Sequence, residues 1–368
     1  MEKIKLTDIC NPKQWKTIPT SELLENGYPV YGANGIIGYY SEFNHKNPVI
    51  TVTCRGATCG TINITVPKSY VTGNAMCLDD MRSDIYMEYL YYCLKHYNFN
   101  NVISGSAQPQ ITRQGMEKIY VTIGSHNEQM DIVDKLKKVE NVIGLRKREL
   151  KQLDTLVKSR FVELFGNVFL NTMKWEEHSL ELIADIVSGI TKGRKMKQQT
   201  LMEVPYMAVS NVKDGYIDWT TIKTIKATEQ EINQYRLLPN DVLMTEGGDP
   251  DKVGRGAIIR KPLENCIHQN HIFRVRLNTT YILPEFFAEY LQHQRAKRYF
   301  LRCAKQTTGI ASINMKQLRA LPVLIPPIEL QNQFADFVAS IDKSKSKIQK
   351  SLEETQLLFD SLMQKYFG

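Results

Sequence analysis

Basic and amide side chains gather around glycine-rich turns at two places in the sequence. Arg55–Gly60 follows one short apolar run, and Gly247–Gly256 follows another. Glycine lets backbone N–H groups approach phosphates closely, while arginine pairs with guanine and asparagine or glutamine with adenine. This combination indicates contact with nucleic acid. The candidate contact residues are Asn34, Arg55, Thr58, Asn74, Gln108, Gln110, Lys192, Arg194, Lys195, Lys197, Asn211, Arg255, Asn270, His271 and Ser312.

Each candidate also has an ordinary structural interpretation. A single asparagine in a loop commonly caps a turn, and the basic run Lys192–Lys197 could be a solvated surface loop. However, Asn34 recurs as Asn211 in the second half of the sequence, and Asn74 recurs as Asn270. This recurrence makes a functional role as well supported as the structural one. The net charge of +8, from 47 Lys and Arg against 39 Asp and Glu, points weakly to a polyanionic partner.

The signatures of nucleic-acid enzymes are absent from the sequence. No Gly-Lys-Ser or Gly-Lys-Thr marks a phosphate-binding loop, and the only Pro-Pro, at Pro326, lacks the preceding Asn or Asp of an amino-methyltransferase site. Pro250–Asp251 is not followed by the Asp/Glu-x-Lys of a common nuclease core. The pair His268 and His271 falls in a predicted strand or loop, where a structural or DNA-contacting role is favoured over metal binding. We therefore expect no catalysis and no cofactor on this chain.

The seven cysteines and the apolar runs limit the setting of the protein. The closest cysteine pair, Cys54 and Cys59, has no second pair and no nearby histidines to complete a zinc site, so we expect reduced, mostly buried thiols and no metal ion. No apolar run reaches the roughly 18 residues of a membrane helix, and residues 1–5 lack the apolar stretch of a signal peptide. The protein is expected to be cytoplasmic.

The sequence contains an internal tandem repeat. Residues 111–166 align without a gap to residues 313–368, with Gln129 opposite Gln331 and a Phe-Gly pair closing each copy. The parts that precede them match more loosely and require an insertion in the second copy. Two globular parts have therefore diverged, whereas the segments that follow them have kept their register.

The conserved ends of the two copies are predicted to be long helices. Apolar residues recur at alternating spacings of four and three along 126–166 and 328–368, which is the pattern of a heptad seam. About 35 helical residues span on the order of 50 Å at about 1.5 Å per residue. A core helix in each domain is the alternative, but this length favours two arms that pack on each other along the seam and hold the globular parts apart.

The globular parts, 1–125 and 167–327, are predicted to be α+β. Short buried strands are expected at 48–53 and 241–245, and short helices at 87–94 and 285–291. The fold class is therefore α+β, with two globular domains that alternate with two long helices.

This order of domains and helices resembles the specificity subunits of type I restriction-modification systems. The resemblance covers essentially the whole chain. Its most specific features are the strand-then-glycine passages 49–60 and 242–256, the turn 308–313, the segment 321–331 that leads into the second helix, and the Phe-Gly that closes each helix.

The resemblance implies a sequence-specific, non-catalytic DNA-recognition subunit. Two target-recognition domains would each read one half of a split, asymmetric DNA sequence. The helices would pack as an antiparallel coiled coil with pseudo-two-fold symmetry. The subunit would dock two modification subunits and, through them, restriction subunits, and S-adenosylmethionine, ATP and Mg²⁺ would bind only to those partners.

The sequence leaves two other functions open. An architectural coiled-coil protein that binds DNA without sequence preference would give its two globular halves little reason to differ around a preserved scaffold. A nuclease with a disguised site is the least favoured interpretation.

Overall fold

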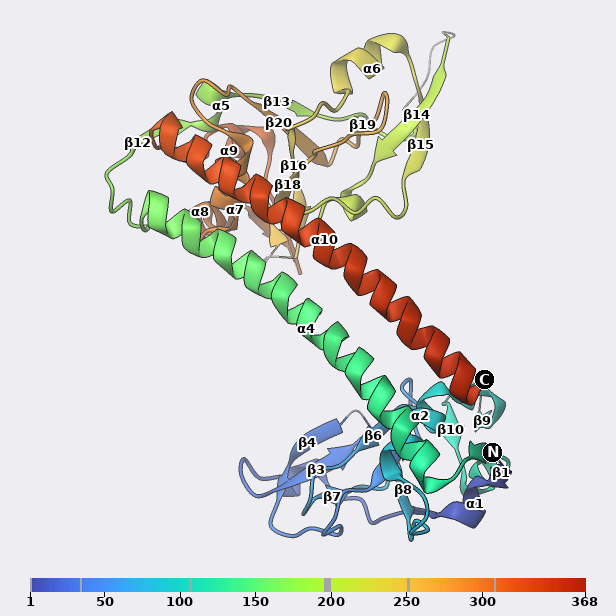
Figure 1. Cartoon of the computed structure of the whole chain (residues 1–368). Helices are drawn as coiled ribbons and strands as arrows, with labels where there is room; N and C mark the ends of the chain where they lie inside the picture. Colours follow the sequence, from blue (N-terminus) through green and yellow to red (C-terminus); the bar gives the residue numbers. More distant parts are fainter. Residues whose placement is uncertain (1, 34, 106–107, 195–199, 250–251, 308) are drawn as a thin grey trace. The chain divides into compact units, whose positions relative to one another are not determined.

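The computed structural model describes residues 2–33, 35–105, 108–194, 200–249, 252–307 and 309–368 (Figure 1). The chain forms two compact units. Unit 1 comprises residues 1–148 and 349–368, and unit 2 comprises residues 149–348. Each unit thus contains one globular part together with segments of both long helices, α4 (His126–Phe165) and α10 (Ile328–Phe367).

Unit 1 is built on two larger sheets. The four-stranded sheet is antiparallel throughout, and its order is β2 (Asn11–Gln14), β8 (Ala75–Asp79), β5 (Ile50–Thr53) and β6 (Ile62–Ile64). Every residue of β5 is buried, as expected for a β-branched strand in the middle of a covered sheet. The second sheet has the order β4 (Gly35–Tyr40), β3 (Tyr28–Gly32) and β7 (Tyr70–Val71), with β3 and β7 parallel. Two smaller pairs join β1 (Glu2–Lys5) to β11 (Tyr120–Ile123) and β9 (Ile103–Ser104) to β10 (Gln110–Ile111).

The helices of unit 1 share one apolar core with its four-stranded sheet. They are α1 (Leu6–Ile9), α2 (Met87–His96) and α3 (Arg113–Met116), together with the segments of α4 and α10. Tyr89 and Leu90 of α2 are fully buried in a cluster that also contains Leu136 of α4 and Phe359 of α10. The Tyr89 hydroxyl donates a hydrogen bond of 2.8 Å to the carbonyl of Thr122, which satisfies its buried polar end.

Unit 2 repeats this plan with additional elements. Its four-stranded antiparallel sheet has the order β13 (Ala184–Ser188), β20 (Ile272–Leu277), β16 (Val242–Thr245) and β18 (Gly256–Ile258). A second sheet has the order β15 (Lys223–Ala227), β14 (Met202–Met207) and β19 (Ile267–His268). The smaller sheets are β17 (Gly247–Gly248) with β22 (Ile310–Ser312) and β21 (Lys305–Thr307), and β12 (Glu176–Ser179) with β23 (Pro322–Ile325).

Most helices of unit 2 share an aromatic core. They are α5 (Leu180–Ile183), α7 (Pro284–Gln292), α8 (Gln294–Cys303) and α9 (Met315–Arg319), with the segments of α4 and α10, whereas α6 (Glu229–Tyr235) packs in a separate cluster. Phe161 and Phe165 of α4 contact Phe334 of α10 with ring centroids 5.4 and 5.7 Å apart, and Phe286 of α7 lies 4.7 Å from Phe165. The ends of the two long helices are therefore part of this core.

The structure contains the helices and strands that the sequence predicted. The mixture of helices and strands is confirmed, and the two long helices begin at the predicted residues. The predicted strands at 48–53 and 241–245 correspond to β5 and β16, and the predicted short helices correspond to α2 and α7. The division into segments 1–125, 126–166, 167–327 and 328–368 stays a prediction.

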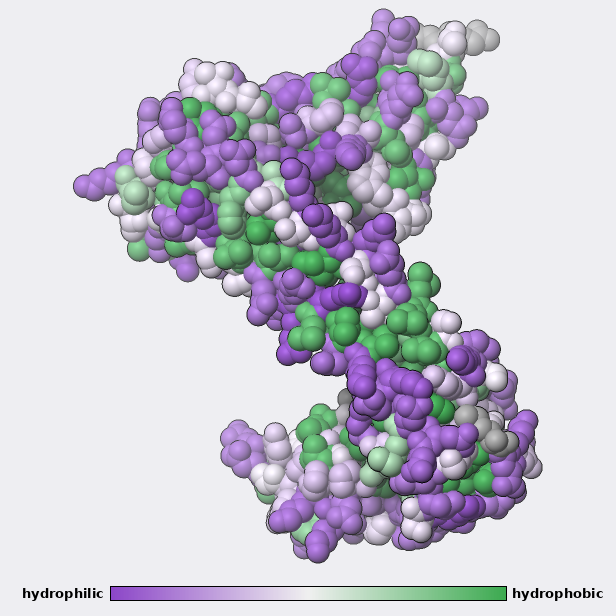
Figure 2. Space-filling model, viewed as in Figure 1, coloured by the Kyte–Doolittle hydropathy of each residue, from purple (hydrophilic) through white to green (hydrophobic). Residues whose placement is uncertain are grey.

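None of the helices in the described ranges combines the length and apolarity needed to cross a bilayer. Figure 2 shows a mostly hydrophilic face on which apolar residues form separate patches.

Candidate nucleic-acid interface

In unit 1, the loop after β5 lies against the strand β10. The backbone N–H of Ile111 donates to Cys54 O at 3.0 Å, and Gly56 N donates to Pro109 O at 3.1 Å. Between these bonds, the backbones of Arg55 and Gln110 form an isolated antiparallel β-bridge. Gly60 closes the loop with a φ of +90°, and a Cβ at this position would lie 2.8 Å from Cβ of Phe99. Glycine is therefore required there for both conformation and space.

The loop brings several predicted contact residues of unit 1 together. Cys54 N donates to Asn74 O at 3.1 Å, so Asn74 lies beside the start of the loop, and Thr58 lies within it. Gln108 is exposed in the turn that leads to Gln110. The side chains of this group make no hydrogen bond to another described residue, so their polar atoms are available to a ligand.

In unit 2, the same backbone arrangement surrounds Glu246. Glu246 N donates to His271 O at 3.0 Å, and Ile313 N donates to Glu246 O at 2.9 Å. Gly247 is paired with Ser312 in the small sheet of β17 and β22. Thr245 N donates to Arg255 O at 3.1 Å, which closes the loop. The predicted residues Arg255, Asn270, His271 and Ser312 are thereby brought together.

Strand register corrects the equivalences that were predicted between the two halves. Thr53 faces Ala75 and Thr245 faces Ile272, so Asn74 corresponds to His271 rather than to Asn270. Arg55 pairs with Gln110 and Gly247 with Ser312, so Arg55 corresponds to Gly247. Arg255 lies at the other end of the loop. The predicted equivalence of Asn74 with Asn270 is therefore wrong by one residue.

Glu246 is a member of the unit 2 cluster that the sequence analysis missed. Its Oε2 lies 2.5 Å from Nδ1 of His271, and Nε2 of His271 lies 3.5 Å from Nδ2 of Asn270. The His271 side chain is 56% exposed, so this pair faces solvent. A carboxylate can accept a hydrogen bond from the N4 amino group of cytosine. The position of Glu246 directly after a buried strand was the available signal.

Arg255 is partly buried and His268 is fully buried. Nε of Arg255 is buried and has no hydrogen-bond partner among the described residues. His268 is fully buried, and its Nδ1 donates to Ile272 O at 3.0 Å. Burial lowers the pKa of His268 to about 4, so its ring is neutral at pH 7. His268 is therefore a core residue and does not form a pair with His271.

Asn211 lies outside both clusters and has a structural role. The residue is 3% exposed, its Oδ1 accepts from Ala208 N at 3.0 Å, and its Nδ2 donates to the carbonyls of Asp218 and Thr221 at 2.9 and 3.0 Å. These bonds hold the turn η3 (Val209–Asn211) and the loop after it. The amide is not offered to a ligand, so Asn211 is left out of the proposed interface.

The basic run of unit 2 divides between two environments. Lys192 is exposed. Nε and Nη2 of Arg194 donate to both carboxylate oxygens of Glu231 at 2.6 and 2.7 Å, and this guanidinium lowers the pKa of Glu231. Arg194 therefore anchors the first turn of α6. Asn34, Lys195 and Lys197 lie outside the described residues.

Comparison with known proteins gives a consistent result. A family profile described as type I restriction modification DNA specificity domain matches residues 1–155 and 173–355. A putative type I restriction enzyme MjaX specificity subunit of Methanocaldococcus jannaschii is 29% identical over 195 residues, which are 52% of this chain and 45% of that protein. The type I restriction enzyme EcoKI specificity subunit of Escherichia coli is 23% identical over 303 residues, 77% of this chain and 65% of that protein. The chain thus matches about half to two thirds of the length of these relatives.

Solved structures share the fold. The S subunit of a type I restriction-modification system from M. genitalium has a TM-score of 0.63 at 16% identity, with 100% of this chain and 96% of that chain covered. A second structure, from work on complex assembly and conformational transition of the type I R-M system, has a TM-score of 0.57 at 16% identity, with 100% and 97% covered.

Proposed function

The chain belongs to the type I restriction-modification DNA specificity family, and from this premise we propose that it is the subunit that reads a bipartite, asymmetric target on double-stranded DNA. Each unit would read one half of the target, unit 1 through the loop after β5 and unit 2 through the loop after β16.

One observation carries this proposal. The two units present different side chains from the same backbone arrangement. Where unit 1 has Arg55 and Gln110, unit 2 has Gly247 and Ser312. Arginine and glutamine donate to purines in the major groove, whereas glycine and serine offer much less. Two equivalent loops with different chemistry suit two different half-sites better than binding without sequence preference.

We propose that α4 and α10 pack as an antiparallel coiled coil that separates the two half-sites. Contacts within each unit support this arrangement. In unit 1, Nη1 of Arg146 donates to Ser351 O at 2.5 Å. In unit 2, Nζ of Lys345 lies 2.5 Å from Oδ1 of Asp154, and the rings of Phe161 and Phe334 are also in contact. A tandem repeat with pseudo-two-fold symmetry would offer two similar surfaces, one for each of two modification subunits.

The subunit is proposed to contribute recognition and no chemical step. S-adenosylmethionine would bind to the modification subunits, and ATP and Mg²⁺ would serve the restriction subunits that join through them. The complex would work in the cytoplasm. The seven cysteines are free thiols in the structure, which suits a reducing compartment.

A domain exchange tests the proposal. Residues 1–125 would be replaced by the equivalent domain of a relative, and the protein would be assembled with its modification partner and supplied with DNA. Sequencing of the methylated positions should show a change in one half-site only. The matched exchange of residues 167–327 should change the other half-site. A change in both half-sites after either exchange, or methylation without a sequence motif, would contradict the proposal.

A further inference from the structure

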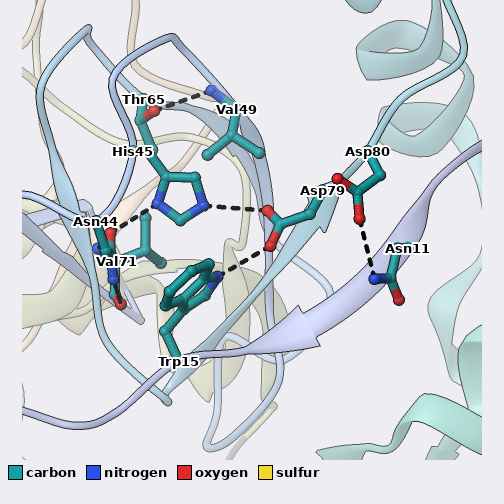
Figure 3. Close-up of polar contacts among 9 residues, drawn as sticks. All are labelled: Asn11, Trp15, Asn44, His45, Val49, Thr65, Val71, Asp79 and Asp80. Carbon is teal, nitrogen blue, oxygen red and sulfur yellow. Dashed lines mark hydrogen bonds and ion pairs between the residues drawn. The ribbon is translucent and has the colours of Figure 1, made fainter.

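A histidine, a cysteine and an aspartate of unit 1 lie together beneath its surface. Nε2 of His45 is 3.0 Å from Oδ1 of Asp79 (Figure 3). Cys77 precedes Asp79 by two residues on β8, so their side chains leave the same face of the sheet. One ligand atom from each of His45, Cys77 and Asp79 lies within 4.8 Å of the other two.

Nδ1 of His45, the ring nitrogen that does not face Asp79, is held by the side-chain amide of Asn44. Nδ1 of His45 lies 2.6 Å from Oδ1 of Asn44. The orientation of this amide follows from its partners, because Oδ1 accepts from Val71 N at 2.9 Å and Nδ2 donates to Val71 O at 3.0 Å. An oxygen therefore faces Nδ1, and the ring must carry a hydrogen on that nitrogen.

Oδ2 of Asp79, the carboxylate oxygen that does not face His45, is also held by a hydrogen bond. Nε1 of Trp15 donates to Oδ2 of Asp79 at 3.0 Å, which leaves Oδ1 facing the histidine (Figure 3). Histidines that bind metals commonly donate their second N–H to an oxygen, and carboxylate ligands are commonly hydrogen-bonded at their other oxygen. Asn44 and Trp15 provide this outer shell for His45 and Asp79.

Nε2 of His45 and Oδ1 of Asp79 face each other and need a cation between them. With its hydrogen on Nδ1, a neutral imidazole has a lone pair on Nε2, and the carboxylate oxygen opposite it is also an acceptor. Two acceptors 3.0 Å apart repel each other unless a proton or a metal ion lies between them. Sγ of Cys77 is fully buried and makes no hydrogen bond to any residue in the described ranges, so a third ligand atom is available.

We propose that His45, Cys77 and Asp79 bind one zinc ion through Nε2, Sγ and a carboxylate oxygen. Thiolate, imidazole and carboxylate are the usual ligands of zinc, and three protein ligands leave a fourth position for water. The side chains of His45 and Asp79 are 10% and 12% exposed, which gives an ion a path to the site. The site would join the loop before β5 to the end of β8.

Unit 2 provides an internal control. Thr51 faces Cys77 and Leu243 faces Arg274, and likewise Asn11 faces Asp79 and Asp185 faces Arg276. The positions of Cys77 and Asp79 are therefore occupied by arginines in unit 2. A guanidinium has no lone pair for a metal ion. One zinc ion per chain, not two, is expected.

The test uses the full chain. Protein equilibrated with zinc and freed of excess should retain about one zinc per chain by elemental analysis. Cobalt in place of zinc should give a thiolate-to-cobalt charge-transfer band. C77S and H45Q should lose both the metal and the band, whereas C93S, which changes another buried cysteine of unit 1, should keep them. Zinc should raise the unfolding temperature of wild type and C93S only.

The result can also overturn the proposal. Wild-type protein without retained zinc would mean that a proton lies between His45 and Asp79. Full zinc retention by C77S would place the ion elsewhere. If C77S does not fold, X-ray absorption of the wild-type zinc protein decides. One sulfur ligand together with imidazole supports the site, and a coordination shell without sulfur contradicts it.

Discussion

Oε1 of Gln129 accepts a hydrogen bond of 2.7 Å from the backbone N–H of Tyr86, which ties the first turn of α4 to the residue that precedes α2. Nε2 of Gln129 donates to the carbonyls of Asp84 and Gly124 at 3.1 and 3.0 Å. Gln331 makes the same three kinds of contact in unit 2, with Leu283 N, Tyr281 O and Pro326 O at 2.8, 3.0 and 2.8 Å. Both glutamines are buried, so each long helix is joined to its globular part by a satisfied amide.

Replacing either glutamine by alanine should destabilise the unit that contains it. The change leaves one backbone N–H and two carbonyls without their partner, and a buried unsatisfied group costs about 1–3 kcal/mol. We expect Q129A and Q331A each to lower the free energy of unfolding by about 2–3 kcal/mol in urea titrations. Q349A removes an exposed glutamine of α10 whose side chain bonds to Glu353, and it should change the free energy of unfolding by less than about 0.5 kcal/mol. An equal effect of all three variants would refute the anchoring role.

The stability of unit 2 should fall as the pH drops from about 6.5 to about 4. The pKa of His268 is lowered to about 4 in the folded protein, whereas it is near 6.5 when unfolded. Between these values the unfolded chain binds a proton that the native chain does not, so the stability present above pH 6.5 is lost by up to about 3 kcal/mol on acidification. H268N keeps a donor for the Ile272 carbonyl and should have a shallower pH dependence. Parallel curves for the two proteins would contradict this prediction.

Asn270 and Asn211 should respond differently to alanine substitution. Asn270 lies beside His271 at the candidate interface, and loss of a bidentate base contact costs about 1–3 kcal/mol of discrimination. N270A should bind cognate and scrambled duplexes with more similar affinities when assembled with the modification partner. N211A should keep the wild-type ratio of the two affinities and instead unfold more easily, since the amide of the buried Asn211 makes three hydrogen bonds. A loss of discrimination in N211A alone would reverse these roles.

Lys192 and Arg194 should also separate. Lys192 is exposed and suits a phosphate contact, so K192A should weaken binding to all sequences and reduce the slope of log affinity against log salt by about one. R194A removes the bidentate pair with Glu231 and should lower stability by about 1 kcal/mol, with the salt slope unchanged. Titrations at several salt concentrations and thermal unfolding would distinguish them. A salt slope that changes only in R194A would exclude Lys192 as a phosphate contact.

Lengthening both long helices should change the DNA spacer. Seven residues inserted near Arg146, matched by seven near Ile348, keep the heptad pattern and add about 10 Å. The preferred distance between half-sites should increase by about three base pairs at about 3.4 Å each, while both half-sites stay the same. Insertion in one helix only breaks the match and should impair assembly. An unchanged spacer would mean that the helices do not set it.

The sequence by itself determined the elements whose signal is local. The alternation of apolar residues predicted α4 and α10, the apolar runs predicted β5 and β16, and the glycine turns located the two loops. The repeat placed Gln129 opposite Gln331, and the structure gives them equivalent partners. These predictions succeed because helix periodicity and strand burial depend on neighbours in the chain.

Only the tertiary structure decided what the individual polar residues do. Asn211 and Asn270 look alike in the sequence, but one is closed by backbone partners and the other lies beside the exposed His271. Arg194 belongs to a basic run, yet Glu231 from a later helix neutralises it. His45 and Cys77 are far apart in the chain and meet only because the loop that carries His45 lies against β8. A side chain's partners depend on packing between distant segments, and that packing leaves no periodic trace in the sequence.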